Sequence, residues 1–182
     1  FVDLGFAGAL IPEEFGGTGL SPLATIQIAE CMGRTLATAP FVASGVMAAT
    51  ALLEGSNDAL KTDLLPQIAA GRILSLAVDE GARHHPGNFA LRAQKDGTNY
   101  RLTGAKQAVI AGGVAEDLVV AASGDTSAEV ILLVVSAKAK GLKIETRTPM
   151  DSLPIATLTF ENVVVPASAL IAGPADGARV LE

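Results

Sequence analysis

Residues 71–78 read Gly71-Arg72-Ile73-Leu74-Ser75-Leu76-Ala77-Val78, and at this stretch the sequence changes its character. Residues 73–78 form an apolar run of strand length directly after a glycine and an arginine. The sequence before the run carries helix-capping residues and helical spacing. The sequence after it consists of short apolar runs separated by turn residues. We therefore expect helices before Gly71 and strands after it.

Three helices are expected on the N-terminal side. Ser21 is a good N-cap and Pro22 suits the first helical position, so one helix begins there. A second helix covers about residues 40–53. Residues 56–58 can cap a third helix, which we expect Pro66 to close.

About eight strands are expected on the C-terminal side. The turn at residues 96–98 contains a glycine between two short runs, which is typical of a hairpin. The connections leave no room for crossover helices, so the sequence predicts an α+β chain with an antiparallel β-barrel or sandwich. The expected strands are residues 73–78, 89–95, 100–103, 106–111, 117–122, 130–136, 142–146 and 155–160.

The composition argues against several classes of partner. The 182 residues carry 13 Lys and Arg against 19 Asp and Glu, a net charge of −6 without any basic run, which disfavours binding to nucleic acid or to anionic membrane surfaces. The longest mostly apolar stretch, residues 41–53, is too short to span a bilayer. Cys31 is the single cysteine; it fits a reducing cytoplasm, and we expect it to be a buried thiol.

Five segments, taken in order, carry a resemblance to one family. Each segment alone is weakly specific, but their order and spacing resemble the acyl-CoA dehydrogenases over nearly the whole chain. The segments are Leu10–Leu20, Leu64–Gly71, Leu76–Glu80, Tyr100–Lys106 with the following Gly112-Gly113, and Phe160–Pro166.

The resemblance implies a domain plan and an activity. Residues 1–71 would form part of an N-terminal helical domain, residues 72–170 the middle β domain, and residues 171–182 the start of a C-terminal helical bundle whose remainder is absent from this chain. Members of the family hold FAD between the middle domain and the bundle. They oxidise an acyl-CoA thioester at its α and β carbons, pass electrons to an electron-transferring flavoprotein, and assemble as homo- or hetero-oligomers. The family's glutamate base lies in the bundle, so no catalytic residue is assigned here.

The resemblance also points to five cofactor-binding positions. Val78 and Asp79 fall where the family usually ends a strand on a threonine at the flavin's pyrimidine edge. Ala108, Val109 and Ile110 fall where the family usually has an aromatic, an aliphatic and a hydroxyl residue against the flavin ring, and Ile110 has no side-chain donor. Two plainer interpretations stay open: Asp79 ends a strand and caps a turn, and residues 106–110 are an ordinary buried strand.

The loop at residues 81–88 offers two further candidates. Arg83 can meet a phosphate through its guanidinium group, or it can simply be solvated. His84 and His85 are adjacent, but no third ligand is suggested nearby, so they form a poor metal pair. Many family members carry an arginine within the stretch that corresponds to residues 151–154, and this sequence has none there.

Three functions remain open from the sequence. The first is an acyl-CoA dehydrogenase-like flavoprotein, either catalytic itself or the non-catalytic partner subunit of a heteromeric member. The second is a binding or structural module that keeps the fold without redox chemistry, because a fold does not fix a function. The third is another flavin-dependent oxidase or monooxygenase on the same scaffold.

Overall fold

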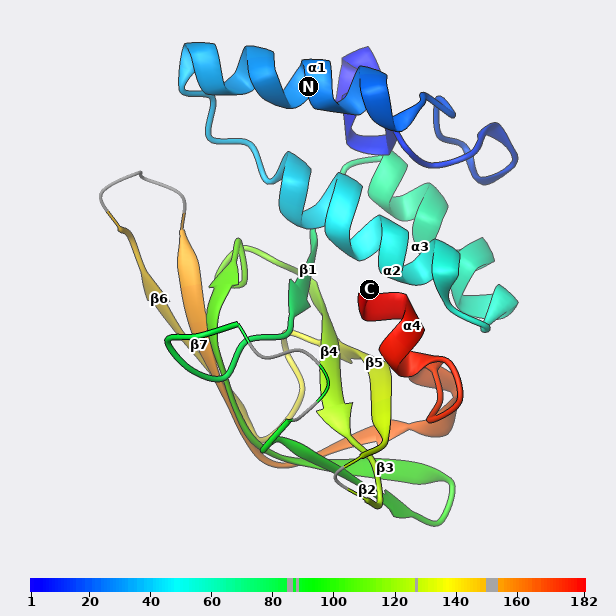
Figure 1. Cartoon of the computed structure of the whole chain (residues 1–182), viewed down its shortest axis with the longest axis vertical. Helices are drawn as coiled ribbons and strands as arrows, with labels where there is room; N and C mark the ends of the chain where they lie inside the picture. Colours follow the sequence, from blue (N-terminus) through cyan, green and yellow to red (C-terminus); the bar gives the residue numbers. More distant parts are fainter. Residues whose placement is uncertain (85–86, 88, 127, 150–153) are drawn as a thin grey trace.

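A computed structural model describes residues 1–84, 87, 89–126, 128–149 and 154–182 of the chain. Figure 1 shows the N-terminal helices stacked over a strongly curled sheet, with the C-terminal helix lying between them. The expected fold class is confirmed, since helices come first and a mostly antiparallel sheet follows. Within the described residues, no helix has both the length and the apolar character needed to cross a membrane.

The helices begin where the capping residues predict. The Oγ of Ser21 accepts a hydrogen bond from the backbone N–H of Ala24 at 3.4 Å, and Asn57 caps a later helix by accepting from Leu60 at 3.2 Å. The π-helical segment η4 continues directly into α2, and together they form the second expected helix. The helical elements are η1 (Val2–Leu4), η2 (Phe6–Gly8), η3 (Glu13–Phe15), α1 (Pro22–Thr35), η4 (Phe41–Ala48), α2 (Ala49–Glu54), α3 (Asp58–Ala69), η5 (Ala167–Ala169) and α4 (Gly177–Leu181).

Pro66 does not close its helix, so that expectation is wrong. Helix α3 runs through Pro66 to Ala69, although proline lacks the N–H that a helix interior needs. The carbonyl of Pro66 still accepts from the N–H of Ala70 at 3.0 Å, which completes the last turn. Burial of Leu65 and Ile68 on both sides of the proline packs this turn into the core and offsets the missing bond.

The strands form one sheet in the order β6-β7-β3-β2-β4-β5-β8, with β1 placed beside β4. Two of the expected strands, residues 100–103 and 106–111, merge into the long strand β3, and the short strand β8 was not expected. The strands are β1 (Leu74–Ala77), β2 (Arg92–Asp96), β3 (Asn99–Ile110), β4 (Asp117–Ser123), β5 (Val130–Ser136), β6 (Leu142–Arg147), β7 (Ile155–Pro166) and β8 (Leu170–Ala172).

Strand β1 departs from the antiparallel pattern. It runs parallel to β4, with Leu74 opposite Asp117, and β2 also makes one parallel contact with β4 at Arg92 and Ser123. Parallel neighbours need a long connection between them, which is usually a helix. Here the β2–β3 hairpin is the connection between β1 and β4. The parallel pair was therefore not predicted, because the sequence showed no crossover helix.

Strand β4 is buried along its whole length and separates two apolar cores. The side chains of Leu118, Val120 and Ala122 enter a core enclosed by the curled sheet, whereas Val119 and Ala121 face the helices. The sheet core also contains Leu91, Leu102, Ile131, Leu133, Leu158 and Phe160. The helix-side core also contains Ile11, Leu52, Leu65, Ile68, Leu74 and Leu132.

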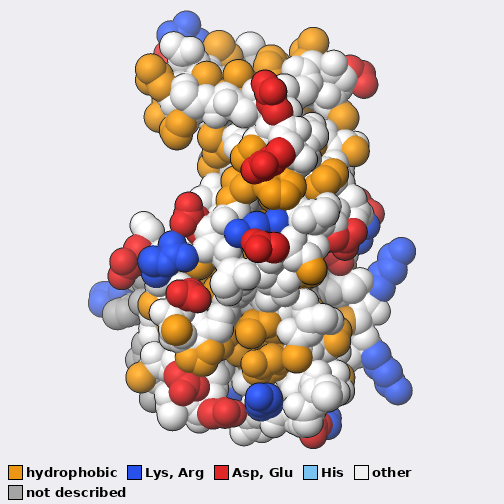
Figure 2. Space-filling view, turned by 90° about the vertical axis from the view of Figure 1, so that its right-hand side faces the viewer, with side chains coloured by type: hydrophobic (Ala, Val, Ile, Leu, Met, Phe, Trp, Pro, Cys, Tyr) orange, Lys and Arg blue, Asp and Glu red, His pale blue; other side chains and the backbone are white. Residues whose placement is uncertain are grey.

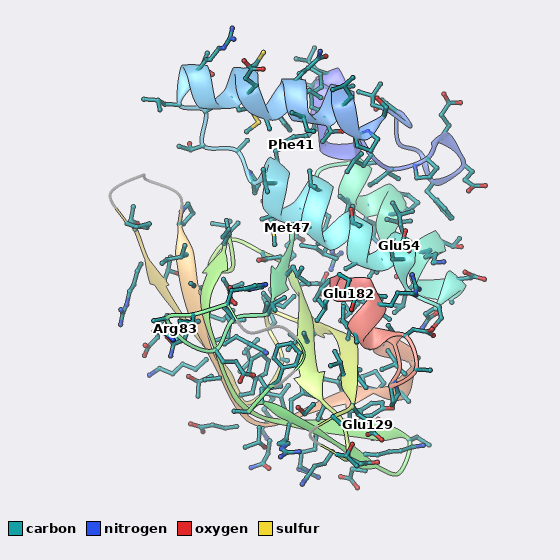
Figure 3. All side chains as sticks on the ribbon, viewed as in Figure 1. Phe41, Met47, Glu54, Arg83, Glu129 and Glu182 are labelled. Atoms are coloured by element: carbon teal, nitrogen blue, oxygen red, sulfur yellow. The ribbon has the colours of Figure 1, made fainter. Side chains whose placement is uncertain are left out.

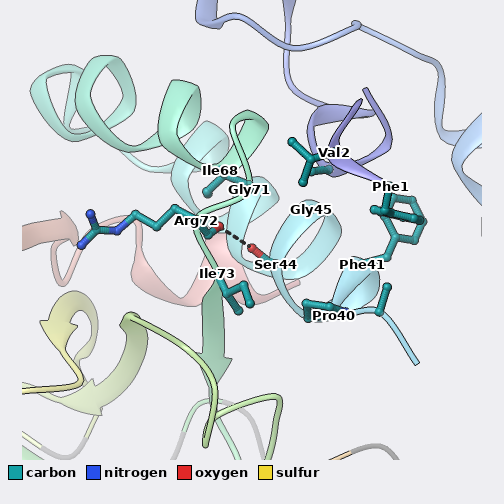
Figure 4. A pocket seen from close by; sticks show the side chains of 12 residues that line it. Phe1, Val2, Pro40, Phe41, Ser44, Gly45, Ile68, Gly71, Arg72 and Ile73 are labelled. Carbon is teal, nitrogen blue, oxygen red and sulfur yellow. Dashed lines mark hydrogen bonds between the residues drawn. The ribbon is translucent and has the colours of Figure 1, made fainter. Parts of the chain in front are cut away.

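Polar contacts connect the N-terminal helices to the sheet near Arg72, where the helical sequence ends and the strands begin. The guanidinium of Arg72 contacts the buried carboxylate of Asp117 at 2.6 and 2.8 Å. The Oγ of Ser44, on η4, accepts from the N–H of Leu74 at 3.1 Å. It also lies within 3.4 Å of the carbonyl of Arg72, beside a small pocket beneath the N-terminal turns (Figure 4).

One glycine permits β3 to lie close to Leu91, the residue directly before β2. Strand β3 is irregular between Leu102 and Gly104, and Gly104 has a φ of +140°. A Cβ added there would lie 2.7 Å from the Cα of Leu91. We expect Gly104→Ala to lower the free energy of unfolding by about 2 kcal/mol or more, because it adds backbone strain and a clash with backbone. Urea denaturation at neutral pH measures this change.

Gly97→Ala is the matched control for this prediction. Gly97 opens the two-residue turn between β2 and β3 with a φ of +61°, but an added Cβ there meets nothing within 4 Å. Only the conformational cost applies, about 1 kcal/mol. Equal losses of stability in the two variants would contradict the close-approach explanation.

Candidate functional site

A pocket of about 420 Å³ opens where the ends of β1 and β3 meet the helices. We call it the β1–β3 pocket. Its strand side is formed mainly by Val78, Asp79, Ala108, Val109 and Ile110. Its helical side is formed by Met47 and Thr50 of η4 and α2 and by Val180, Leu181 and Glu182 at the end of α4. Figure 3 labels Met47 and Glu182 on this helical side, above the sheet.

The five residues that the sequence predicted to hold a cofactor all line this pocket. Val78 and Asp79 follow β1, whereas Ala108, Val109 and Ile110 end β3, so two distant segments supply them. The structure therefore brings the five together, and their role in binding stays a prediction. The helical residues of the pocket were missed, because nothing in their own sequence marks them as neighbours of β1 and β3.

A β-bulge shapes the end of β3. Lys106 is paired with Leu158 and Val109 with Ala156, so Gln107 and Ala108 together stand opposite a single residue of β7. Ala108 has a φ of +51°, a left-handed conformation that side chains other than glycine rarely adopt. Bulges of this kind bend a strand and turn its side chains to a new direction. Here the bulged residues line the pocket, so residues 106–110 are not an ordinary regular strand.

Two hydrogen bonds join β1 and the segment directly after it to β3, although the two strands are not neighbours in the sheet order. The N–H of Gln107 donates to the carbonyl of Asp79 at 2.7 Å. The buried Oγ of Ser75 donates to the carbonyl of Ile110 at 2.5 Å. These hydrogen bonds fix the position of the β3 bulge relative to the end of β1.

Asp79 has a side-chain partner at the pocket. Its Oδ1 lies 2.7 Å from the Nδ1 of His84, and about a third of the Asp79 side chain is exposed. Asp79 thus faces both the pocket and the loop after β1, so its carboxylate can accept a hydrogen bond from a bound molecule. His84 was considered in the sequence only as a metal ligand, and its contact with Asp79 was missed.

A buried ion pair lies behind the strand side of the pocket. The ammonium of Lys106, which is fully buried, donates to the carboxylate of Glu80 at 2.8 Å and to the carbonyl of Val78 at 2.9 Å. The ammonium also lies 3.9 Å from the ring centroid of Phe89. Glu80 in turn accepts the N–H groups of Ala90 and Leu91 at 2.6 and 3.0 Å.

Burial and pairing pull the pKa values of this pair in different directions. Burial, the largest influence, lowers the pKa of Lys106 to about 8, against the hydrogen bond and charge of Glu80 and the charge of Asp79, which raise it. Burial raises the pKa of Glu80. The hydrogen bonds from Lys106, Leu91 and Ala90 outweigh that effect, so the Glu80 pKa lies below its ordinary value of 4.5.

The remaining candidates from the sequence have different outcomes. Arg83 lines a depression with Glu80 and Phe89 in the loop after β1 (Figure 3), so both its phosphate-binding and its solvated interpretation stay open.

Cys31 is exposed on α1, so the expectation of a buried thiol is wrong. Helix α1 lies at the outside of the helical stack, and Thr25 is its only buried residue. His85 and residues 151–153 lie outside the described residues.

An apolar groove adjoins the pocket at Ile110, which lines both. The groove has a volume of about 560 Å³ and runs between α1, η4 and the end of β3. Leu36, Val42 and Val114 on it are largely exposed. Figure 2 shows apolar side chains gathered on the helical part and on the sheet in one face of the molecule. The surroundings of the pocket are thus suited to apolar groups.

The residues of the pocket fit a flavin in part. Side chains at Val78 and Ala108 offer a small apolar surface for a planar ring, and Asp79 offers an acceptor for an imide N–H, whereas the side chain of Val109 is buried in the sheet core. Ile110 offers no hydroxyl at the place where the family usually has one. Among the described residues, no group of three His, Cys, Asp or Glu side chains could hold a metal ion.

A family model and individual relatives both match this chain to the acyl-CoA dehydrogenases. Residues 1–72 match the family model of the acyl-CoA dehydrogenase N-terminal domain. Acyl-CoA dehydrogenase FadE27 of Mycobacterium tuberculosis is 32% identical over 133 residues, which cover 72% of this chain and 35% of that protein.

Two solved structures share the fold over 99% of this chain. The glutaryl-coenzyme A dehydrogenase in its glutaryl-CoA complex matches with a TM-score of 0.88 and 25% identity, and this chain covers 49% of it. The ChsE4–ChsE5 complex of Mycobacterium tuberculosis matches with a TM-score of 0.86 and 27% identity over 48% of the matched chain. This chain spans about half or less of the length of its curated relatives.

The buried ion pair predicts a bell-shaped pH dependence for the stabilisation contributed by Glu80, measured as the difference in free energy of unfolding between wild type and Glu80→Gln. Glu80→Gln keeps the size and an acceptor but removes the charge that faces Lys106, so we expect the free energy of unfolding to fall by about 2 kcal/mol near pH 6. The stabilisation by Glu80 is present above pH 4.5 and is lost as the pH falls through its lower folded pKa. The difference between wild type and variant also shrinks as the pH rises to about 8, because Lys106 then loses its charge.

Urea denaturation between pH 3.5 and 9.5 measures both sides of this curve. Glu145→Gln is the control, because Glu145 pairs with the exposed Lys143, whose hydrogen bond to Glu145 raises its pKa. The loss of unfolding free energy caused by Glu145→Gln should not become smaller near pH 8. A difference between wild type and Glu80→Gln that stays constant from pH 4 to 9 would contradict the role given to the pair.

Proposed function

Because this chain belongs to the acyl-CoA dehydrogenase family, we propose that the full-length protein is a flavoprotein of the acyl-CoA dehydrogenase type and that the β1–β3 pocket holds part of its FAD. The observation that carries the proposal is the convergence of Val78, Asp79, Ala108, Val109 and Ile110 on one pocket. The division into residues 1–71, 72–170 and 171–182, an acyl-CoA substrate, an electron-transferring flavoprotein as electron acceptor and a cytoplasmic location belong to the same proposal.

The described residues would bind and orient the cofactor. FAD, when bound, supplies the acceptor for a hydride from the acyl group. Asp79 would accept a hydrogen bond at the polar edge of the ring, and Ala108 would contact its face. The apolar groove that shares Ile110 with the pocket would exclude water beside the site. We assign no catalytic base among these residues.

A second form of the proposal is that the chain belongs to a subunit that supports a catalytic partner. Three replacements favour it: Asp79 in place of threonine, Ala108 in place of an aromatic residue, and Ile110 in place of a hydroxyl residue. The solved ChsE4–ChsE5 complex pairs two differently named proteins. Its likeness to this chain supports a hetero-oligomer, in which this subunit would shape the interface and contribute part of a cofactor site.

The full-length protein decides between these forms. We would purify it alone and co-expressed with a second family subunit from its genomic neighbourhood, and then measure flavin content and anaerobic bleaching by acyl-CoA thioesters. Flavin and bleaching in the protein alone support a self-sufficient dehydrogenase. Flavin and bleaching only in the mixture support the partner subunit. A colourless protein in both preparations would show that both forms are wrong.

The charge of Asp79 predicts a shifted flavin potential. A carboxylate at the edge that becomes anionic on reduction disfavours the reduced flavin. In flavin-bound full-length protein, Asp79→Thr should raise the two-electron midpoint potential by an amount on the order of 30 mV, which corresponds to about 1.4 kcal/mol. Asp96→Asn is the control, since Asp96 pairs with Arg101 on the exposed hairpin. An unchanged or lowered potential in Asp79→Thr would show that Asp79 does not face the flavin.

A further inference from the structure

The β1–β3 pocket is lined by the ends of two strands that are not neighbours in the sheet. Strand β1 is hydrogen-bonded to β4, and β3 is bonded to β7 and β2, so no ladder joins β1 to β3. After Ala77 the chain leaves the sheet, and Val78 and Asp79 form their side of the pocket from outside any strand. Something other than the sheet must therefore keep these residues against the bulge.

Lys106 supplies this connection from inside the protein. It lies on β3 directly before the bulged residues Gln107 and Ala108, and its ammonium reaches the carbonyl of Val78 at 2.9 Å. The next residue, Gln107, donates its N–H to the carbonyl of Asp79 at 2.7 Å. Two consecutive residues of β3 thus hold two consecutive carbonyls beyond β1, one through a side chain and one through the backbone.

The same ammonium organises the far end of the β1–β2 loop. Glu80 bonds to Lys106 and also accepts the N–H groups of Ala90 and Leu91. The ring of Phe89, from that same segment, lies against the ammonium. Lys106 therefore stands at the centre of three segments, which are residues 78–80, residues 89–91 and the bulge of β3.

The energetics favour a specific role for this lysine. A fully buried ammonium is expensive unless it is paired and its donors are satisfied. Its two hydrogen bonds and the aromatic face meet that requirement, and no buried side-chain polar atom among the described residues lacks a partner. A methionine of similar length would fill the space, but it would leave the carbonyl of Val78 without its donor and the charge of Glu80 without its counter-ion.

We propose that Lys106 is a positioning residue that holds Val78 and Asp79 against the bulge of β3 and so fixes the shape of the ligand-binding side of the β1–β3 pocket. The identity of the ligand as FAD rests on the proposed function, whereas the ordering of the pocket in the free protein does not.

The test compares Lys106→Met with Lys143→Met in the full-length protein. Lys143 is the matched control, because it also forms a lysine–glutamate pair but lies exposed on β6, away from the pocket. Amide hydrogen exchange of the ligand-free protein is measured first. In Lys106→Met we expect exchange of the amides of Ala90, Leu91 and Gln107, which donate to Glu80 and Asp79, to become at least about tenfold faster, with β5 and β6 unchanged. In Lys143→Met these three amides should exchange as in wild type.

Hydrogen exchange separates positioning from general stability. An unchanged rate at these three amides, or an equal acceleration over every strand, would overturn the proposal, since the second result describes a lysine that merely stabilises the whole fold. Glu80→Gln/Lys106→Met, which removes both charges, should restore global stability toward wild type but leave the amide of Gln107 in fast exchange, because Val78 still lacks its donor. Restored protection at Gln107 in that double variant would also overturn the proposal.

FAD binding provides the second measurement. We expect the dissociation constant of FAD to rise at least about tenfold in Lys106→Met and to stay at the wild-type value in Lys143→Met. An equal dissociation constant in all three proteins would overturn the link between Lys106 and the ligand. Wild-type protein that binds no FAD would refute the proposed function, and the exchange rates would then decide the positioning role independently.

Discussion

The structure depends on one constraint, which is that β4 has no face toward solvent. Alternate side chains of this strand enter the core enclosed by the sheet and the core shared with the helices, so Leu118 and Val119 stabilise different halves of the molecule. Any displacement of β4 would disturb both cores at once. The Arg72–Asp117 contact lies at the start of this strand and the pairing with β1 runs along it, so the helical part and the sheet are coupled through the same residues. The position of the pocket follows, because β1 lies beside β4 and Asp79, just after β1, is hydrogen-bonded to the bulge of β3.

The pocket combines a rigid strand side with a helical side of different origin. On the strand side, a left-handed Ala108, a bulge and a buried ammonium fix the backbone, and such local strain persists only where the surroundings hold it. On the helical side, η4, α2 and α4 contribute side chains, and Arg179 of α4 bonds to Glu54 of α2 at 2.8 and 2.9 Å. The five residues singled out by the family resemblance thus line one pocket, and their role in binding a cofactor stays a prediction.

Much of the fold could be predicted from local sequence, and the failures have physical causes. Strand β5 was predicted at its observed bounds, because a continuous apolar run between turn residues is typical of a strand buried on both faces. The N-cap at Ser21 is a local interaction and was also found. The continuation of α3 through Pro66 depends on tertiary packing, which local propensity does not contain. The five pocket residues came from the order of motifs, whereas the Lys106–Glu80 pair joins residues 26 positions apart and left no sign in the spacing.

The parallel pairing of β1 with β4 has a consequence for the order in which the molecule folds. The β2–β3 hairpin closes over a two-residue turn and needs only local contacts, so it can form early. Strand β1 pairs with β4 across all the residues of the hairpin, and closing that long loop is entropically costly. The contacts that bring Val78 and Asp79 to the bulge thus belong to the late, non-local class. A newly made chain would therefore have a complete hairpin before it had this pocket.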